Sequence, residues 1–125
     1  MKRKNRLSRS RDFDAVYRHG RSVSSRYLVL YAFPRTQDEE LGEEPRLGLA
    51  VSRQVGGAAE RNRIKRRLRA AFEEIRSGVP TGVDYVLIAK AGFVEAAESH
   101  GFPWLLDCVR DVFRQIRLGH EGTRR

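Results

Sequence analysis

The spacing of hydrophobic positions predicts a helix near the start of the chain. Phe13, Val16 and Tyr17 recur at i, i+3 and i+4 and therefore share one helical face. Ser10 is a candidate N-cap and Gly20 a natural end, so we expect this helix at about residues 10–20. Residues 1–9 are polar and basic without periodicity, and we expect them to form a flexible arm.

Three apolar stretches predict strands, at residues 26–33, 46–52 and 84–90. The first is apolar on both sides, with Tyr27, Val29, Tyr31 and Phe33 pointing one way and Leu28, Leu30 and Ala32 the other. Both of its faces must then be covered, one of them by a partner that tolerates aromatic rings. The second strand has a bulky face and a nearly bare one, formed by Gly48, Ala50 and Ser52.

Two further helices are predicted, at about residues 60–77 and 103–119. The first follows Gly56 and Gly57, and the second has an apolar stripe that includes Cys108, which we expect to be a core residue. The order α-β-β-α-β-α predicts an α+β fold, an α/β sandwich with helices packed on a small sheet. A chain of 125 residues is expected to form a single domain, 1–125.

The net charge narrows the choice of partner. Lysine and arginine total 25 against 16 acidic residues, which gives a net charge of +9. Five of the acids crowd into 37–44, within a loop at 34–45 that we expect to be mobile, so the rest of the chain is still more basic. Such a field attracts polyanions, above all nucleic acid or an anionic membrane, although a basic protein that is merely soluble is the alternative.

The same sequence argues against a membrane or secreted protein. The longest apolar runs, such as 27–33, are too short to span a bilayer, and the basic N-terminus lacks the apolar segment of a secretory signal. The single cysteine, Cys108, cannot form an internal disulfide, which fits a reducing compartment. We therefore expect a cytoplasmic protein.

Residues 61–69 hold six cations in nine positions. On a helix, Ile64, Leu68 and Phe72 fall on one apolar stripe, whereas Arg63, Arg66 and Arg69 lie on the opposite side. A solvated charged face is the alternative, but acidic i, i+4 partners are nearly absent there. We therefore predict a surface that binds phosphates, with arginine forks suited to bidentate contact. Its residues are Arg61, Asn62, Arg63, Lys65, Arg66, Arg67 and Arg69.

Candidate catalytic chemistry is missing. His19, His100 and His120 are scattered and have no cysteine or carboxylate at ligand spacing. Glu73 and Glu74 are adjacent, so on a helix they point in different directions and are poor candidates for a two-metal site. We expect no catalytic residue and no metal ligand in this chain.

The basic stretch and its surroundings resemble a known family. The run Arg61-Asn62-Arg63-Ile64-Lys65-Arg66, preceded by Gly48-Leu49-Ala50-Val51-Ser52-Arg53 and a glycine turn, resembles the signature of the protein subunit of bacterial ribonuclease P. The resemblance extends to Arg11-Asp12-Phe13-Asp14-Ala15-Val16-Tyr17, Arg21-Ser22-Val23, Tyr27-Leu28-Val29-Leu30-Tyr31 and Asp84-Tyr85-Val86-Leu87-Ile88-Ala89-Lys90.

The resemblance implies a fold and a function. It implies a roughly four-stranded sheet with three helices and a left-handed β-α-β crossover around the basic helix, which no sequence rule would predict. It also implies that a catalytic RNA subunit removes the 5′ leader of precursor tRNA using Mg²⁺, while the protein binds no cofactor itself. The implied partners are that RNA and precursor tRNA, and neither a membrane nor DNA. The protein is expected to assist binding of substrate and Mg²⁺.

The resemblance further implies a cleft for the single-stranded leader, between the first helix and the sheet. From the residues, Phe13, Tyr17 and Tyr31 could stack on unpaired bases, and Ser52 and Arg53 would lie beside the bare face of the second strand. An ordinary aromatic core is the alternative. Two positions depart from the family pattern: Gln54 stands where a second basic residue is usual, and Gly57 where asparagine is usual.

Two other functions remain open from the sequence. A ribosomal or other structural RNA-binding protein without a role in cleavage is consistent with the charge. A nuclease acting without RNA would need a cluster of metal-binding carboxylates, which the sequence does not supply.

Overall fold

A computed structural model of the chain describes residues 21–34 and 44–117. The described elements are β1 (Arg21–Ser24), β2 (Leu28–Pro34), β3 (Arg46–Val51), α2 (Ala58–Ile75), β4 (Val83–Ala89), α3 (Phe93–His100) and α4 (Phe102–Arg117), with short 3₁₀ helices η2 (Arg53–Val55) and η3 (Arg76–Gly78) on either side of α2. The predicted α+β class is confirmed. The predicted first helix, the basic arm and most of the acidic loop lie outside the described residues.

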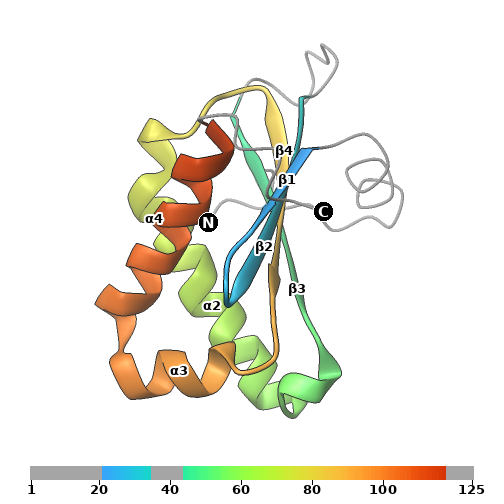
Figure 1. Ribbon diagram of the computed structural model, residues 1–125, viewed down its shortest axis with the longest axis vertical. Helices are drawn as coiled ribbons and strands as arrows, with labels where there is room; N and C mark the ends of the chain where they lie inside the picture. Colours follow the sequence, from blue (N-terminus) through green and yellow to red (C-terminus); the bar gives the residue numbers. More distant parts are fainter. Residues whose placement is uncertain (1–20, 35–43, 118–125) are drawn as a thin grey trace.

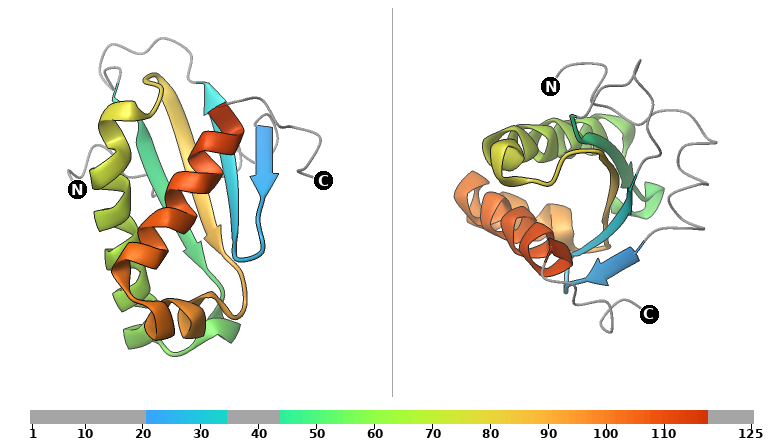
Figure 2. Two further views of the ribbon diagram at one scale, coloured as in Figure 1. Left: turned by 60° about the vertical axis from the view of Figure 1, so that its left-hand side comes forward. Right: turned by 90° about the horizontal axis from the view of Figure 1, so that it is seen from above.

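The four strands form one mixed sheet in the order β1-β2-β4-β3. β2 is antiparallel to both β1 and β4, whereas β4 is parallel to β3, and α2 connects this parallel pair. Seen from the helix side with β3 and β4 pointing upwards, β4 lies to the left of β3 (Figure 2). The β3-α2-β4 crossover is therefore left-handed, as the family resemblance implied.

All three described helices cover the same face of the sheet (Figures 1 and 2). Because side chains alternate along a strand, Leu28, Leu30 and Ala32 of β2 all point toward the helices. They are almost fully buried there, with exposed fractions of at most 1%. They join the apolar stripes of α2 and α4 and the alternate residues of β4. The main members from these elements are Ile64, Leu68, Phe72, Tyr85, Leu87, Leu105, Val109 and Val112.

The opposite face of the sheet is also buried at its centre. Val86 of β4 has an exposed fraction of 0%, and Tyr31, Phe33 and Ile88 pack against it. The expectation that β2 is covered on both faces stays a prediction for this face, because Val29, Tyr31 and Phe33 are only partly buried and the described helices lie on the other side. Tyr27 does not follow the predicted alternation. It precedes β2, and its ring lies 5.3 Å from that of Trp104 on the helix side.

The C-terminal region differs from the sequence-based expectation in two respects. Helix α3 was not predicted from the sequence; it begins after Gly92, which has a positive φ of 89°, and ends at Gly101, which has a φ of 87°. These glycines adopt a left-handed backbone that other residues rarely enter, so they separate α3 from its neighbours. Cys108 packs against the core but is only partly buried, because it lies at the margin of the apolar stripe of α4.

Candidate nucleic-acid interface

The basic stretch, residues 61–69, begins directly after Glu60 in the first turn of α2. Gly57 is the N-cap residue, and the carboxylate Oε1 of Glu60 accepts a hydrogen bond from the backbone N–H of Gly57 at 3.0 Å. Glu60 also provides the negative charge that the positive end of a helix dipole favours. Gly57 has no side chain to cap the helix, so Glu60 acts alone where an N-cap asparagine would add a second acceptor.

The predicted apolar stripe of α2 is confirmed. Ile64, Leu68, Ala71 and Phe72 are buried against the sheet and α4. Asn62, Arg63 and Arg66 are exposed, whereas the other basic residues of the stretch are partly exposed along the two edges of the stripe: Arg61, Lys65, Arg67 and Arg69. Arg69, which was expected opposite the stripe, is therefore nearer an edge.

The two basic edges of α2 face different neighbours. Arg63 forms an ion pair with Glu98 of α3 at 3.0 Å, so this edge lies toward α3 and α4. On the other edge, Arg76 at the end of α2 pairs with Glu44, which directly precedes β3. Arg61, Lys65 and Arg69 share the Arg76 edge by helical spacing, so they lie along the edge strand β3.

Most cations within residues 61–67 have no acidic partner among the described residues. Within residues 61–67, Arg63 is the cation that forms an ion pair with a described residue, Glu98 of α3. Both side chains of this pair are nearly half exposed, at 44% and 46%. Arg61, Lys65, Arg66 and Arg67 form no ion pair with any described carboxylate. The positive charge concentrated on this face is thus largely uncompensated within the described structure.

A second surface lies on the face of the sheet that the described helices leave open. The strand register aligns Ser22, Tyr31, Val86 and Gly48 in one row across β1, β2, β4 and β3. Tyr31 is partly exposed, and Gly48 adds no side chain beyond Val86. Tyr31 and Gly48 are two strand spacings apart, roughly 10 Å. Ser22, Val86 and Gly48 of this row are buried, so the row forms a mostly apolar floor in which the partly exposed ring of Tyr31 lies toward one side.

The next row across the sheet continues this floor. Val29, Ile88 and Ala50 are aligned on β2, β4 and β3. Ser52 follows β3 and is exposed, and its Oγ accepts a hydrogen bond from the backbone N–H of Gln54 at 3.1 Å. Arg53 is the first residue of η2, directly beyond that end of β3.

The structure thus brings together only part of the predicted leader cleft. Tyr31, Gly48 and Ala50 share one sheet face, and Ser52 and Arg53 follow at its border. Phe13 and Tyr17 lie outside the described residues. Sequence reasoning missed Val86 and Ile88, which lie between Tyr31 and the bare face of β3, although the two-sided apolar pattern of residues 84–90 could have indicated them.

The described residues contain no group of three or more His, Cys, Asp or Glu side chains that could hold a metal ion. In the same ranges, no helix has the length and apolar character needed to cross a bilayer.

These features define a class: an α+β protein in which a basic helix makes a left-handed crossover between parallel strands. The ribonuclease P protein from Thermotoga maritima has this fold, with a TM-score of 0.77 and 27% identity over 88% of this chain and 96% of that one. A ribonuclease P protein component from Shouchella clausii is 44% identical over 90 residues, 72% of this chain and 70% of that protein. One from Rhodococcus opacus is 39% identical over 116 residues, 91% and 84% of the two chains.

The family model described as Ribonuclease P matches residues 1–117, and the chain belongs to this family. Its function is that of the protein component of ribonuclease P, the ribonucleoprotein endonuclease of tRNA processing. In general terms, this membership implies association with ribonuclease P RNA and a tRNA substrate. Neither the relatives nor the fold favours a separate structural RNA-binding role.

Proposed function

We propose that α2 binds the catalytic RNA subunit through phosphate contacts. The observation that carries this proposal is the face of α2 on which Arg61, Lys65, Arg66 and Arg67 have no ion pair with a described carboxylate. Like charges at this density repel one another, and phosphates would relieve that repulsion while releasing condensed counterions. The buried stripe keeps the helix fixed, so binding would not require it to fold first.

The single-stranded 5′ leader of precursor tRNA would lie across the open sheet face. Unpaired bases stack on aromatic rings without strict sequence preference, and Tyr31 offers such a ring beside the floor of Val86 and Gly48. Phe13 and Tyr17 are proposed to complete the cleft, and Arg53 to neutralise phosphate. Because Arg61, Lys65 and Arg69 lie along β3, the two RNA surfaces would be neighbours, which would hold the leader against the catalytic RNA.

The protein would contribute binding, and the RNA subunit would contribute the cleavage chemistry. Mg²⁺ would be held by the RNA, and the protein would lower the concentration of Mg²⁺ required by neutralising phosphates that the ion would otherwise screen. The cytoplasm is the proposed location, since the lone cysteine and the RNA partners are both consistent with it.

Reconstitution tests the proposal. Cleavage of precursor tRNA is measured with the protein alone, with the RNA subunit alone and with both, at low salt and low Mg²⁺. The protein alone should be inactive, and adding it to the RNA should increase substrate affinity and cleavage. Mg²⁺-dependent cleavage by the RNA-free protein, or no gain over the RNA alone, would contradict the proposal.

A further inference from the structure

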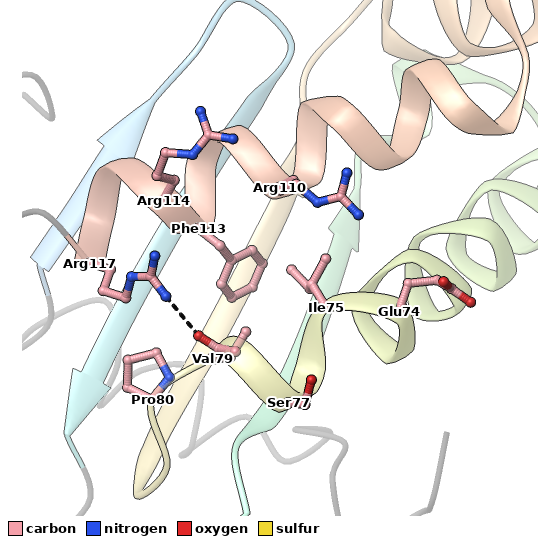
Figure 3. A pocket seen from close by; sticks show the side chains of 10 residues that line it. Glu74, Ile75, Ser77, Val79, Pro80, Arg110, Phe113, Arg114 and Arg117 are labelled. Atoms are coloured by element: carbon pink, nitrogen blue, oxygen red, sulfur yellow. Dashed lines mark hydrogen bonds between the residues drawn. The ribbon is translucent and has the colours of Figure 1, made fainter.

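A pocket lies between α2 and α4 near the end of α2, on the helix-covered side of the sheet (Figure 3). Its volume is about 350 Å³, which falls within the roughly 300–1,000 Å³ typical of small-ligand sites. The sheet separates this pocket from the row of Tyr31 and Gly48. Its lining comes from the last turn of α2, from η3 with the two residues after it, and from the C-terminal half of α4.

The floor of the pocket is apolar and held in place. Phe113 has an exposed fraction of only 6%, and its ring lies 4.9 Å from that of Tyr85 and 5.6 Å from that of Phe72. Val79 and Pro80 extend this floor beyond α2 (Figure 3). These aromatic contacts hold the Phe113 ring in place, so the fold itself fixes the floor of the pocket.

Three arginines of α4 line the pocket: Arg110, Arg114 and Arg117. Arg117 donates a hydrogen bond to the carbonyl oxygen of Gly78 at 2.9 Å, which ties the end of α4 to η3 beside the pocket (Figure 3). A guanidinium group has five N–H donors, so this bond leaves most of them for a ligand.

Arg110 and Arg114 keep their charge available. Each contacts an aspartate three residues earlier, Asp107 at 3.5 Å and Asp111 at 3.2 Å, and the four side chains are between 48% and 75% exposed. Exposed pairs of this kind contribute little stability. The aspartates are not among the lining residues, so they do not form part of the pocket wall.

On its α2 side, the pocket adjoins the basic edge of that helix that contains Arg63 and Arg67. Glu74 lines the pocket, and Arg67 and Arg63 precede it by seven and eleven residues on the same side of the helix. Glu74 would repel a phosphate near α2, so an anion is directed toward Arg110 and Arg114. The Glu74 carboxylate can instead accept a hydrogen bond from a ribose hydroxyl.

We infer that this pocket binds one unpaired, phosphate-bearing nucleotide of RNA. Its phosphate contacts Arg110 and Arg114, and its base packs on the floor of Phe113, Val79 and Pro80. A purely structural explanation is that the C-terminal end of the α4 dipole favours cations such as Arg114 and Arg117. That explanation does not account for the apolar cavity beside them. The inference rests on the proposed function in taking RNA as the polyanion. It adds a third surface that contacts RNA, on the helix-covered side of the sheet.

Titration of the isotope-labelled full chain with AMP, followed by NMR, tests the pocket itself. Saturable shifts are expected at Ser77, Val79 and Phe113, and adenosine, which lacks the phosphate, should bind more weakly. Replacing Arg110 and Arg114 together by Gln should weaken AMP binding by about tenfold or more, since two charge-assisted contacts are lost. Arg26→Gln removes the same kind of charge from the exposed turn between β1 and β2 and should leave AMP affinity unchanged.

The reconstituted enzyme identifies the source of the nucleotide. If the RNA subunit supplies it, the Arg110→Gln, Arg114→Gln double variant should bind that RNA more weakly. If precursor tRNA supplies it, the KM for this substrate should rise while affinity for the RNA subunit is unchanged. The inference is overturned if neither value changes, if AMP and adenosine bind equally, or if an acidic peptide shifts these resonances where AMP does not. None of these results would contradict RNA binding by α2, which is tested separately by measuring the affinity of the Arg66→Gln variant for the RNA subunit.

Discussion

Arg46 and Asp84 form a two-fold hydrogen-bonded ion pair across the parallel strands β3 and β4. Nε of Arg46 donates to Oδ1 of Asp84 at 2.8 Å, and Nη2 donates to Oδ2 at 2.7 Å. The side chains are only 11% and 7% exposed, and the strand register places the two residues opposite each other. The pair lies at one end of the open sheet face, two residues before Gly48 and Val86, so it fixes the alignment of the proposed leader floor.

Breaking this pair should destabilise the fold. Asp84→Leu leaves the Arg46 guanidinium poorly exposed and without this carboxylate, and we expect a loss of about 3–5 kcal/mol in the free energy of unfolding, measured by urea denaturation. Arg46→Met combined with Asp84→Leu removes both charges and should recover much of that loss. Equal destabilisation in the single and double variants would show that the pairing itself contributes little.

The exposed face of α2 should determine how RNA binding depends on salt. Arg66→Ala should lower the slope of log K against log salt for the RNA subunit by about 0.7–0.9, because one phosphate contact is lost. Thermal stability should hardly change, since Arg66 is exposed. Leu68→Ala is the matched control from the buried stripe: it should cost about 2–5 kcal/mol of stability while the folded protein keeps the original slope. The opposite pattern would mean that the wrong face of α2 was assigned to RNA.

Tyr31 should matter for the leader and not for the rest of the tRNA. Tyr31→Leu keeps apolar bulk but removes the ring, and it should weaken holoenzyme binding of precursor tRNA by about 1–3 kcal/mol, the range for one base stack. Affinity for mature tRNA, which lacks a leader, should be unchanged. Tyr27→Leu is the control, because that ring packs on Trp104 on the other side of the sheet. Equal losses for both RNAs in the Tyr31 variant would return Tyr31 to a purely structural role.

The N-cap of α2 should be improvable. Gly57 has φ and ψ of −75° and 176°, which any residue can adopt at an N-cap, and an added Cβ would come no closer than 3.9 Å to a neighbouring atom. Gly57→Asn should therefore stabilise the protein by a few tenths of a kcal/mol or more, through a side-chain acceptor for the helix N–H groups. Gly57→Ala makes a similar change to the unfolded chain without the acceptor and should be less stable than the asparagine variant in thermal melts.

Stability should fall at alkaline pH partly because of Tyr85. Burial, opposed by the charges of Arg21 and Arg117, raises the pKa of Tyr85 from 10.0 to about 12. Since the folded-state pKa lies above the unfolded value, the contribution is fully present below pH 10 and is lost as the pH rises through 12. Tyr85→Phe should therefore flatten the stability profile between those pH values in urea titrations. A profile as steep as that of the original protein would assign the alkaline loss to other groups.

The sequence by itself determined the local features of this protein. Helical spacing of Ile64, Leu68 and Phe72 fixed which face of α2 is buried, and therefore where its cations could be exposed. Alternation in β2 similarly indicated which residues point to the helix side, where Leu28, Leu30 and Ala32 are buried, and which point to the other face, where Tyr31 and Phe33 are partly buried. These properties depend on periods of 3.6 and 2 residues, which a short stretch of sequence carries completely.

The tertiary structure decided which distant residues meet. Strand order places β4 between β2 and β3, so Val86 separates Tyr31 from Gly48, and no local pattern contains that order. The Arg63–Glu98 pair and the pocket over Phe113 likewise join helices separated along the chain. The left-handed crossover runs against the usual handedness and was accessible only through family resemblance. These relationships arise from packing the elements together, since that step depends on the combined shape and charge of surfaces that no single segment contains.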